Sequence, residues 1–311
     1  MKVVIADSLP PDSLQELSRF EGLRVMDRSS IPRRELLREL GDAAGLVVRS
    51  ATSVDRELLG RAPGLKVVGR AGSGVDNIDL AAAREQGVVV MNTPGGNAQA
   101  AAELTIGMMF AVCRSIPAAD ASVKSGLWER KRFVGTQLHG KTLGLIGLGN
   151  VGRVVAVFAR GMAMQVLAHD PYVFQEVAQA AGVVLSRLDR LLEEAHIVSI
   201  HAPRTDDTEG MIASRELGLM RDGAFLLNCA RGGIVVESAL MAALRSGKLA
   251  GIGLDVYDPE PPVDRALLQD PRVVCTPHIG AQSLEAQQQV ALMIATQVGR
   301  FLTTGEAVNT V

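Results

Sequence analysis

Short apolar runs alternate with amphipathic stretches along the first hundred residues of the chain. Five strands are predicted, at 3–6, 23–26, 45–48, 66–69 and 88–91. Between them the pattern predicts a helix capped by Asp12 and running through Phe20, and a short helix at 81–86 ended by Gly87. This alternation indicates a parallel sheet, because parallel neighbours need a crossover connection.

The segment 92–97, Asn-Thr-Pro-Gly-Gly-Asn, interrupts this pattern and predicts a hinge. One long helical pattern follows, from Ala98 to about Ser125. Six further strands are predicted, at 143–146, 166–169, 197–200, 224–228, 252–256 and 273–276. We expect an α/β protein with two doubly wound parallel-sheet domains, in which 283–311 returns to a first domain of 1–96 and 97–282 forms the second.

Composition narrows the class of protein. The 311 residues are 47% hydrophobic and 21% charged, which is typical of a soluble globular chain with a sizeable core. A net charge of −2 without a basic tail argues against nucleic acid as a partner. Neither a signal peptide nor a membrane span is expected, and three cysteines without CxxC spacing predict no disulfide framework and no metal site. These features favour the cytoplasm.

A glycine-rich loop, Gly147-Leu148-Gly149-Asn150-Val151-Gly152, lies between a predicted strand and the helical run 154–159. In this context G-x-G-x-x-G predicts a dinucleotide site, where backbone amides and the helix N-terminus face the pyrophosphate. Asp170 ends the next strand, about 20 positions further on, where a carboxylate binds ribose hydroxyls. Its charge would repel a 2′-phosphate, so NAD is favoured over NADP, although a solvated turn position also explains an aspartate here.

Three chemically useful side chains follow separate predicted strands: Arg231, Glu260 and His278. The carboxyl ends of parallel strands meet at one edge of a sheet, so we expect the three to cluster there. A guanidinium fork suits a substrate carboxylate, and a carboxylate beside an imidazole favours an imidazolium that donates a proton. Taken singly, each residue is better explained without a catalytic role, Glu260 as an exposed loop acid, Arg231 as a solvated loop base and His278 as a hydrogen-bonded turn residue.

Together these segments resemble the D-isomer-specific 2-hydroxyacid dehydrogenases over nearly the whole chain. The motifs are GLGNVG with Asp170, the turn His201-Ala202-Pro203, NCARGGIV, LDVYDPEPP and TPHIGA, in the family's order. The resemblance implies a flavodoxin-like substrate domain, a Rossmann NAD-binding domain inserted in it, and an active site in the cleft between them. It also implies that Arg231, Glu260 and His278 are the catalytic residues.

The resemblance further implies the ligand contacts. Asn150 and Val151 are expected at the pyrophosphate and Asp170 at the ribose. Other cofactor contacts are implied for Ser73, Gly147, Gly149, Gly152, His201, Ala202, Pro203, Cys229, Ala230, Asp255, Ile279, Gly280 and Ala281. Substrate contacts are expected from Arg49, Arg70, Gly72, Ser73, Gly74 and Asn97. Arg130 and Lys131 either reach a substrate phosphate across a dimer interface or are solvated surface charges.

The resemblance is strongest, at the segments 46–52, 69–79 and 126–149, to those family members whose activity is oxidation of 3-phospho-D-glycerate to 3-phosphohydroxypyruvate, the entry step of serine synthesis, and it implies this activity. Alternatives are a reductase of glyoxylate, hydroxypyruvate or another 2-keto acid, and an NADH-sensing, corepressor-like binding protein. A homodimer or homotetramer is expected, with 98–125 as apolar interface. Because the chain ends at Val311, we expect no regulatory domain and no control by serine.

Overall fold

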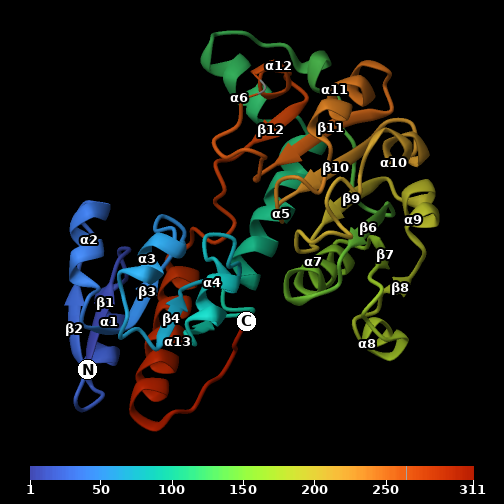
Figure 1. Ribbon diagram of the computed structural model, residues 1–311. Coiled ribbons are helices and arrows are strands. Elements are labelled where there is room, and N and C mark those ends of the chain that lie inside the picture. Colours follow the sequence, from blue (N-terminus) through green and yellow to red (C-terminus); the bar gives the residue numbers. More distant parts are fainter. Residues whose placement is uncertain (264) are drawn as a thin grey trace. The chain divides into compact units, whose positions relative to one another are not determined.

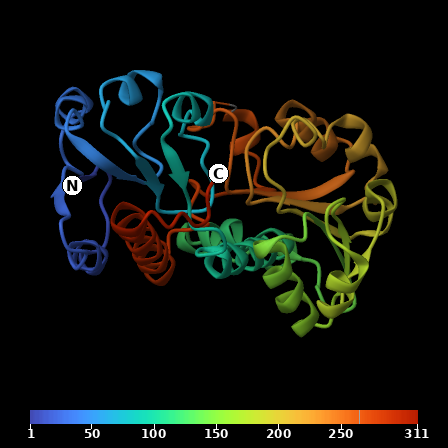
Figure 2. The same cartoon turned by 60° about the horizontal axis from the view of Figure 1, so that its bottom comes forward.

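The computed structural model describes residues 1–263 and 265–311. The chain divides into two compact units, Met1–Asn97 with Ala281–Val311 (unit 1) and Ala98–Gly280 (unit 2). Each unit is a parallel sheet with helices on both faces (Figures 1 and 2). The predicted class, two doubly wound α/β domains, is confirmed.

Unit 1 contains a 5-stranded sheet in the order β2-β1-β3-β4-β5. Its strands are β1 (Lys2–Ile5), β2 (Arg24–Asp27), β3 (Ala43–Val48), β4 (Val67–Arg70) and β5 (Val89–Met91), and its helices are α1 (Pro11–Ser18), α2 (Arg33–Glu39), α3 (Arg56–Gly60), α4 (Leu80–Glu85) and α13 (Leu284–Thr304). Helices α2, α3 and α4 cover one face, and α1 and α13 cover the other. Because both faces are covered, β3 is buried along its whole length.

Unit 2 contains a 7-stranded sheet in the order β12-β11-β10-β9-β6-β7-β8. Its strands are β6 (Thr142–Ile146), β7 (Gln165–His169), β8 (Val184–Leu185), β9 (Ile197–Ile200), β10 (Ala224–Asn228), β11 (Leu249–Leu254) and β12 (Val273–Cys275). Its helices are α5 (Ala98–Cys113), α6 (Ile116–Lys124), the 3-10 helix η1 (Arg130–Phe133), α7 (Asn150–Gly161), α8 (Gln175–Ala180), α9 (Leu188–Glu194), α10 (Ser214–Leu219), α11 (Glu237–Arg245) and α12 (Arg265–Leu268). The strand order reverses between β6 and β9, the position where such sheets bind ligands.

Two local predictions are wrong, and one strand was missed. The single helical pattern from Ala98 to Ser125 is two helices, α5 and α6, bent by 63°. The break occurs because Ser115 has a φ of 50° and Pro117, in the first turn of α6, has no amide to donate. Asp12 lies in the first turn of α1, whose N-cap is Pro10. The two-residue strand β8 is too short for a periodic pattern and was not predicted.

In the described part of the chain, no single helix is both long and apolar enough to cross a membrane. Only the bent pair of α5 and α6 reaches that length and apolarity when the two helices are taken together. The three cysteines in this part of the chain, Cys113, Cys229 and Cys275, are free thiols.

Candidate functional site

The glycine-rich loop joins β6 to α7, and its three glycines have different surroundings. A Cβ on Gly147, whose φ is 96°, would lie 2.7 Å from the carbonyl carbon of His201. A Cβ on Gly152 would lie 2.3 Å from the carbonyl oxygen of Gly147. A Cβ on Gly149 would meet no atom of the described residues within 4 Å. The first and third glycines are therefore required by packing, whereas the second borders open space.

Helix α7 begins directly after this open position. Gly149 is its N-cap, and no side chain in the described part of the chain caps the helix there. The first amides of the helix, from Asn150 and Val151 onward, therefore lack a capping acceptor and carry the positive end of the helix dipole. This arrangement fits a pyrophosphate.

Asp170 connects the end of β7 to the same loop. Its Oδ2 accepts a hydrogen bond from the amide of Leu148 at 2.8 Å, and its Oδ1 accepts one from the amide of Tyr172 at 2.9 Å. Each carboxylate oxygen keeps a second lone pair, so the group can still accept from ribose hydroxyls. Asp170 thus also fixes the loop that it faces.

His201 directly follows β9, and its backbone packs against Gly147 of the glycine-rich loop. Its amide donates to the carbonyl of Ile146 at 2.7 Å, and its Nε2 lies 2.9 Å from Oγ of Ser199. Burial lowers the pKa of His201 to about 4, so the ring is neutral near pH 7. Ala202 is half-buried and Pro203 is exposed on the loop that follows.

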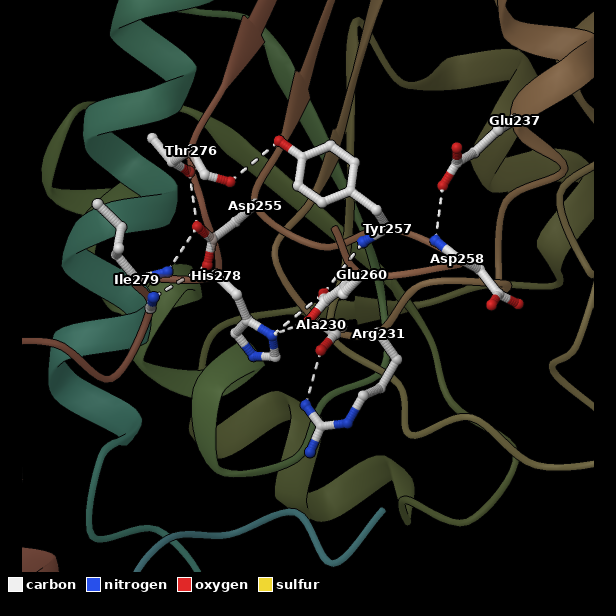
Figure 3. A network of polar contacts seen from close by, with 11 residues as sticks. Ala230, Arg231, Glu237, Asp255, Tyr257, Asp258, Glu260, Thr276, His278 and Ile279 are labelled. Atoms are coloured by element: carbon white, nitrogen blue, oxygen red, sulfur yellow. Dashed lines mark hydrogen bonds and ion pairs between the residues drawn. The ribbon is translucent and has the colours of Figure 1, made fainter. Parts of the chain in front are cut away.

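His278 and Glu260 form the central pair of the site (Figure 3). Nδ1 of His278 lies 2.9 Å from Oε2 and 3.1 Å from Oε1 of Glu260. The amide of Tyr257 donates to Oε1 of Glu260 at 3.2 Å and so helps to hold the carboxylate. The side chains of His278 and Glu260 are 48% and 40% exposed, and Nε2 of His278 has no hydrogen bond to the described residues. A solvent-accessible imidazole with one ring nitrogen held by a carboxylate is suited to proton transfer.

Arg231 lies on the turn after β10. Asn228 holds this turn, because its Nδ2 donates to the carbonyl of Arg231 at 2.9 Å and its Oδ1 accepts from the amide of Ala230 at 3.1 Å. A Cβ on Gly232 would lie only 1.8 Å from the carbonyl oxygen of Tyr257, so this glycine lets the turn pack on the segment that carries Glu260. Since β10, β11 and β12 are neighbours, the structure brings Arg231, Glu260 and His278 together at one sheet edge (Figure 3).

Asp255 holds the backbone around His278, a role that the sequence did not suggest. Its fully buried carboxylate accepts hydrogen bonds from Oγ1 of Thr276 at 2.6 Å and from the amides of Ile279 at 2.8 Å and Gly280 at 2.9 Å. The only advance signal was its position at the end of a predicted strand. The resemblance had implied a cofactor contact instead, which stays a prediction.

Arg204 is a second residue that the sequence did not single out. Its Nη1 lies 2.8 Å from Oδ2 of Asp258, and its Nη2 lies 2.8 Å from Oε1 of Glu209. A Cβ on Gly233 would lie 2.7 Å from its Cζ, so the guanidinium packs over that glycine. Arg204 thereby connects the loop after β9 to the segments that carry Arg231 and Glu260. In the sequence, an arginine in a polar loop looks like any solvated charge.

The predicted substrate residues lie in unit 1. Arg70 packs over Gly72, whose φ is 146° and whose Cβ would collide with Nη1 of Arg70. Oγ of Ser73 donates to Oδ1 of Asn97 at 2.7 Å, and Nδ2 of Asn92 donates to the carbonyl of Ser73 at 2.6 Å. These two hydrogen bonds therefore hold the loop that includes Gly74 against the segment 92–97.

The remaining predicted residues have varied surroundings. Cys229 lies with its Sγ 3.5 Å from the sulfur of Met108, and burial raises the pKa of its thiol to about 12. Ala281 is the first residue of the segment that returns to unit 1. Arg130 and Lys131 are exposed on η1.

Comparison with known proteins identifies the family. Residues 106–280 match the family model for the D-isomer specific 2-hydroxyacid dehydrogenase, NAD binding domain. D-3-phosphoglycerate dehydrogenase of Archaeoglobus fulgidus is 46% identical over 96% of this chain and 56% of its own length. The chain thus spans about half the length of the curated relatives it matches.

Solved structures show the same architecture. The cofactor(NAD+)-bound 3-phosphoglycerate dehydrogenase of Entamoeba histolytica is 29% identical, with a TM-score of 0.84 over 100% of this chain and 98% of that one. A glyoxylate reductase from Paecilomyes thermophila is also 29% identical, with a TM-score of 0.91 over 100% and 98% of the two chains. The resemblance noted in the sequence is confirmed, and the chain belongs to the D-isomer-specific 2-hydroxyacid dehydrogenase family.

Proposed function

We propose that the chain is an NAD-dependent dehydrogenase that oxidises 3-phospho-D-glycerate to 3-phosphohydroxypyruvate, the entry step of serine biosynthesis, and catalyses the reverse reduction. The observation that carries this proposal is the His278–Glu260 pair at 2.9 Å, formed beyond the ends of β11 and β12 at the same sheet edge as the turn of Arg231. The 46% identity to a D-3-phosphoglycerate dehydrogenase supports the choice of acid.

NAD is the cofactor in this proposal. The open position at Gly149 and the uncapped N-terminus of α7 fit its pyrophosphate, and Asp170 binds its ribose and disfavours a 2′-phosphate. The proposal keeps the other cofactor contacts that the sequence implied in unit 2, which are His201, Ala202, Pro203, Cys229, Ala230, Asp255, Ile279 and Gly280. When bound, NAD supplies the hydride acceptor for the oxidation.

The residues of the chain supply binding and proton transfer. Arg231 binds the carboxylate of the acid through its planar guanidinium and keeps the C2 hydroxyl in place. His278 accepts the hydroxyl proton at Nε2, while Glu260 holds the proton on Nδ1 and stabilises the positive charge of the imidazolium. In the reverse direction the same Nε2 returns a proton to the carbonyl oxygen.

The other contacts of the acid come from unit 1 in this proposal. Arg49 and Asn97 bind the phosphate, and the loop of Arg70, Gly72, Ser73 and Gly74 binds the carboxylate through its amides. Arg130 or Lys131 reaches the phosphate of an acid bound to the partner subunit of a homodimer or homotetramer. The location in this proposal is the cytoplasm, a reducing compartment in which free thiols such as those of Cys113, Cys229 and Cys275 are maintained.

A second candidate function is the reduction of glyoxylate or hydroxypyruvate, which the structural similarity to a glyoxylate reductase favours. Steady-state oxidation of NADH over a panel of 2-keto acids separates the two. The proposal predicts the highest kcat/KM with 3-phosphohydroxypyruvate. Preference for an unphosphorylated keto acid would support the second candidate, and tight NADH binding without turnover of any acid would indicate a sensor.

A further inference from the structure

The loop 49–52 follows β3 at the switch point of the unit 1 sheet. In the order β2-β1-β3-β4-β5 the chain leaves β1 and β3 toward opposite sides, and ligands bind such sheets beyond the carboxyl ends of these two strands. Asp7 lies just beyond β1, and Arg49 lies just beyond β3.

Asp7 holds this loop from the side of β1. The residue is only 8% exposed. Its Oδ2 accepts hydrogen bonds from the amides of Arg49 at 2.6 Å and Thr52 at 3.2 Å, and its Oδ1 accepts one from Oγ1 of Thr52 at 2.7 Å. Three donors thus compensate the buried carboxylate, and all of them belong to the loop.

Asn77 holds the same loop from the segment after β4. Its Nδ2 donates to the carbonyls of Arg49 at 2.8 Å and Thr52 at 2.6 Å. Its own carbonyl accepts from the amide of Val54 at 2.8 Å. The amide and the carbonyl of both Arg49 and Thr52 are therefore fixed by two side chains from other segments.

The groups between these fixed points can bind an anion. Among the residues that the structure describes, the guanidinium of Arg49 and the amides of Ser50 and Ala51 have no hydrogen-bond partner. They are donors at the carboxyl end of a central strand, and the backbone that carries them is fixed at Arg49 and Thr52 before any ligand binds. Preorganised donors bind an anion more tightly than donors on a mobile loop.

We propose that Asp7 and Asn77 are positioning residues that hold the loop 49–52 ready for the phosphate of the acid. The inference rests on the proposed function and deepens it, because it names the residues that give the phosphorylated acid its affinity. Neither residue touches the acid. Their loss weakens binding of the acid and leaves the proton transfer at His278 in place.

Steady-state kinetics with 3-phosphohydroxypyruvate and NADH test this proposal. For Asp7→Ala and Asn77→Ala we expect KM for the acid to rise about tenfold while kcat stays within about threefold. The affinity for NADH stays unchanged. Thr52→Val removes only the hydroxyl that donates to Asp7, so we expect it to raise KM less than the alanine variants do. Thr52→Ser keeps this hydroxyl, so we expect it to have the KM of the wild type. These milder variants decide the matter if the alanine variants do not fold.

Two controls separate positioning from general destabilisation. Asp79→Ala removes another carboxylate of unit 1 that accepts a backbone amide, that of Ala82 at 2.8 Å, and should lower the melting temperature without raising KM. In an Arg49→Ala background, Asp7→Ala should raise KM little further, because both changes act through one loop.

Three outcomes overturn the inference: an unchanged KM in the Asp7, Asn77 and Thr52 variants, an equal rise in Asp79→Ala, or full additivity with Arg49→Ala. A wild-type protein that reduces no 2-keto acid would overturn the proposed function together with this inference. Normal wild-type activity with unaffected variants would overturn this inference alone.

Discussion

The buried carboxylate of Asp255 holds the backbone turn on which His278 lies. Its two oxygens accept from the amides of Ile279 and Gly280, and its own carbonyl accepts from the amide of His278 at 2.9 Å. His278 has a φ of 52°, a left-handed conformation that residues other than glycine rarely adopt. The direction of the imidazole therefore depends on a residue that does not touch it.

We expect Asp255→Asn to weaken this turn, because an amide NH2 would replace one acceptor and face a backbone donor. The free energy of unfolding should fall by about 1–3 kcal/mol, and kcat should fall at least about tenfold. Urea unfolding and steady-state kinetics measure the two effects. Thr276→Val, which removes only the hydroxyl donor to Asp255, serves as the milder control. Wild-type stability and turnover in Asp255→Asn would show that the anchor is dispensable.

The glycines of the cofactor loop allow a matched comparison. Gly149→Ala places a methyl group in open space, so we expect a normally folded protein whose Kd for NADH rises about tenfold or more. Gly152→Ala places a methyl group 2.3 Å from the carbonyl oxygen of Gly147, so we expect a loss of stability as well. Calorimetric titration and thermal unfolding check both. Unimpaired NADH binding by Gly149→Ala would argue against a pyrophosphate there.

Arg204 should affect turnover more than stability. Its ion pair with Asp258 joins two partly exposed side chains and contributes at most about 1 kcal/mol. Arg204→Met should nevertheless lower kcat/KM about threefold to tenfold, because Asp258 lies two residues from Glu260. Arg215→Met, which breaks the ion pairs of a more exposed arginine with Asp189 and Glu216, is the control and should leave kcat/KM unchanged. Equal kinetic effects of the two substitutions would remove the special role of Arg204.

The neutral His201 predicts a pH dependence of stability. Burial lowers its pKa to about 4 from an ordinary value of 6.5, so between these values the unfolded chain binds a proton that the folded chain does not. The free energy of unfolding therefore falls as the pH drops below 6.5, by up to about 2 kcal/mol at pH 5. His201→Asn should remove this component, and His139→Asn, at an exposed position, should not. Urea unfolding at pH 7 and pH 5 measures the difference, and identical pH profiles for wild type and His201→Asn would contradict it.

The parts of the fold that follow from local pattern were predictable from the sequence. The buried apolar runs identified 197–200 and 224–228 with the bounds of β9 and β10. The parallel order then placed Glu260 and His278 at one edge, where the structure joins them. The bend between α5 and α6 was not predicted, since the hydrophobic period continues across it, although Pro117 is a sequence signal for a break in the helix.

The supporting residues were not predictable for a different reason. These residues hold loops that are distant in the sequence and adjacent in the structure. They are Asp7, Asn77, Asp255 and Arg204. In the sequence, an aspartate whose buried carboxylate accepts hydrogen bonds from loop amides cannot be distinguished from a solvated aspartate. Only the three-dimensional structure shows which donors surround it.

The central claim is that His278 performs the proton transfer of a dehydrogenase. The most direct measurement is the rate of NADH oxidation with 3-phosphohydroxypyruvate by His278→Ala, with the Kd for NADH determined on the same preparation. We expect kcat to fall by a factor of about 10²–10⁴ while NADH binding stays within about twofold of wild type. Wild-type turnover by this variant would contradict the account.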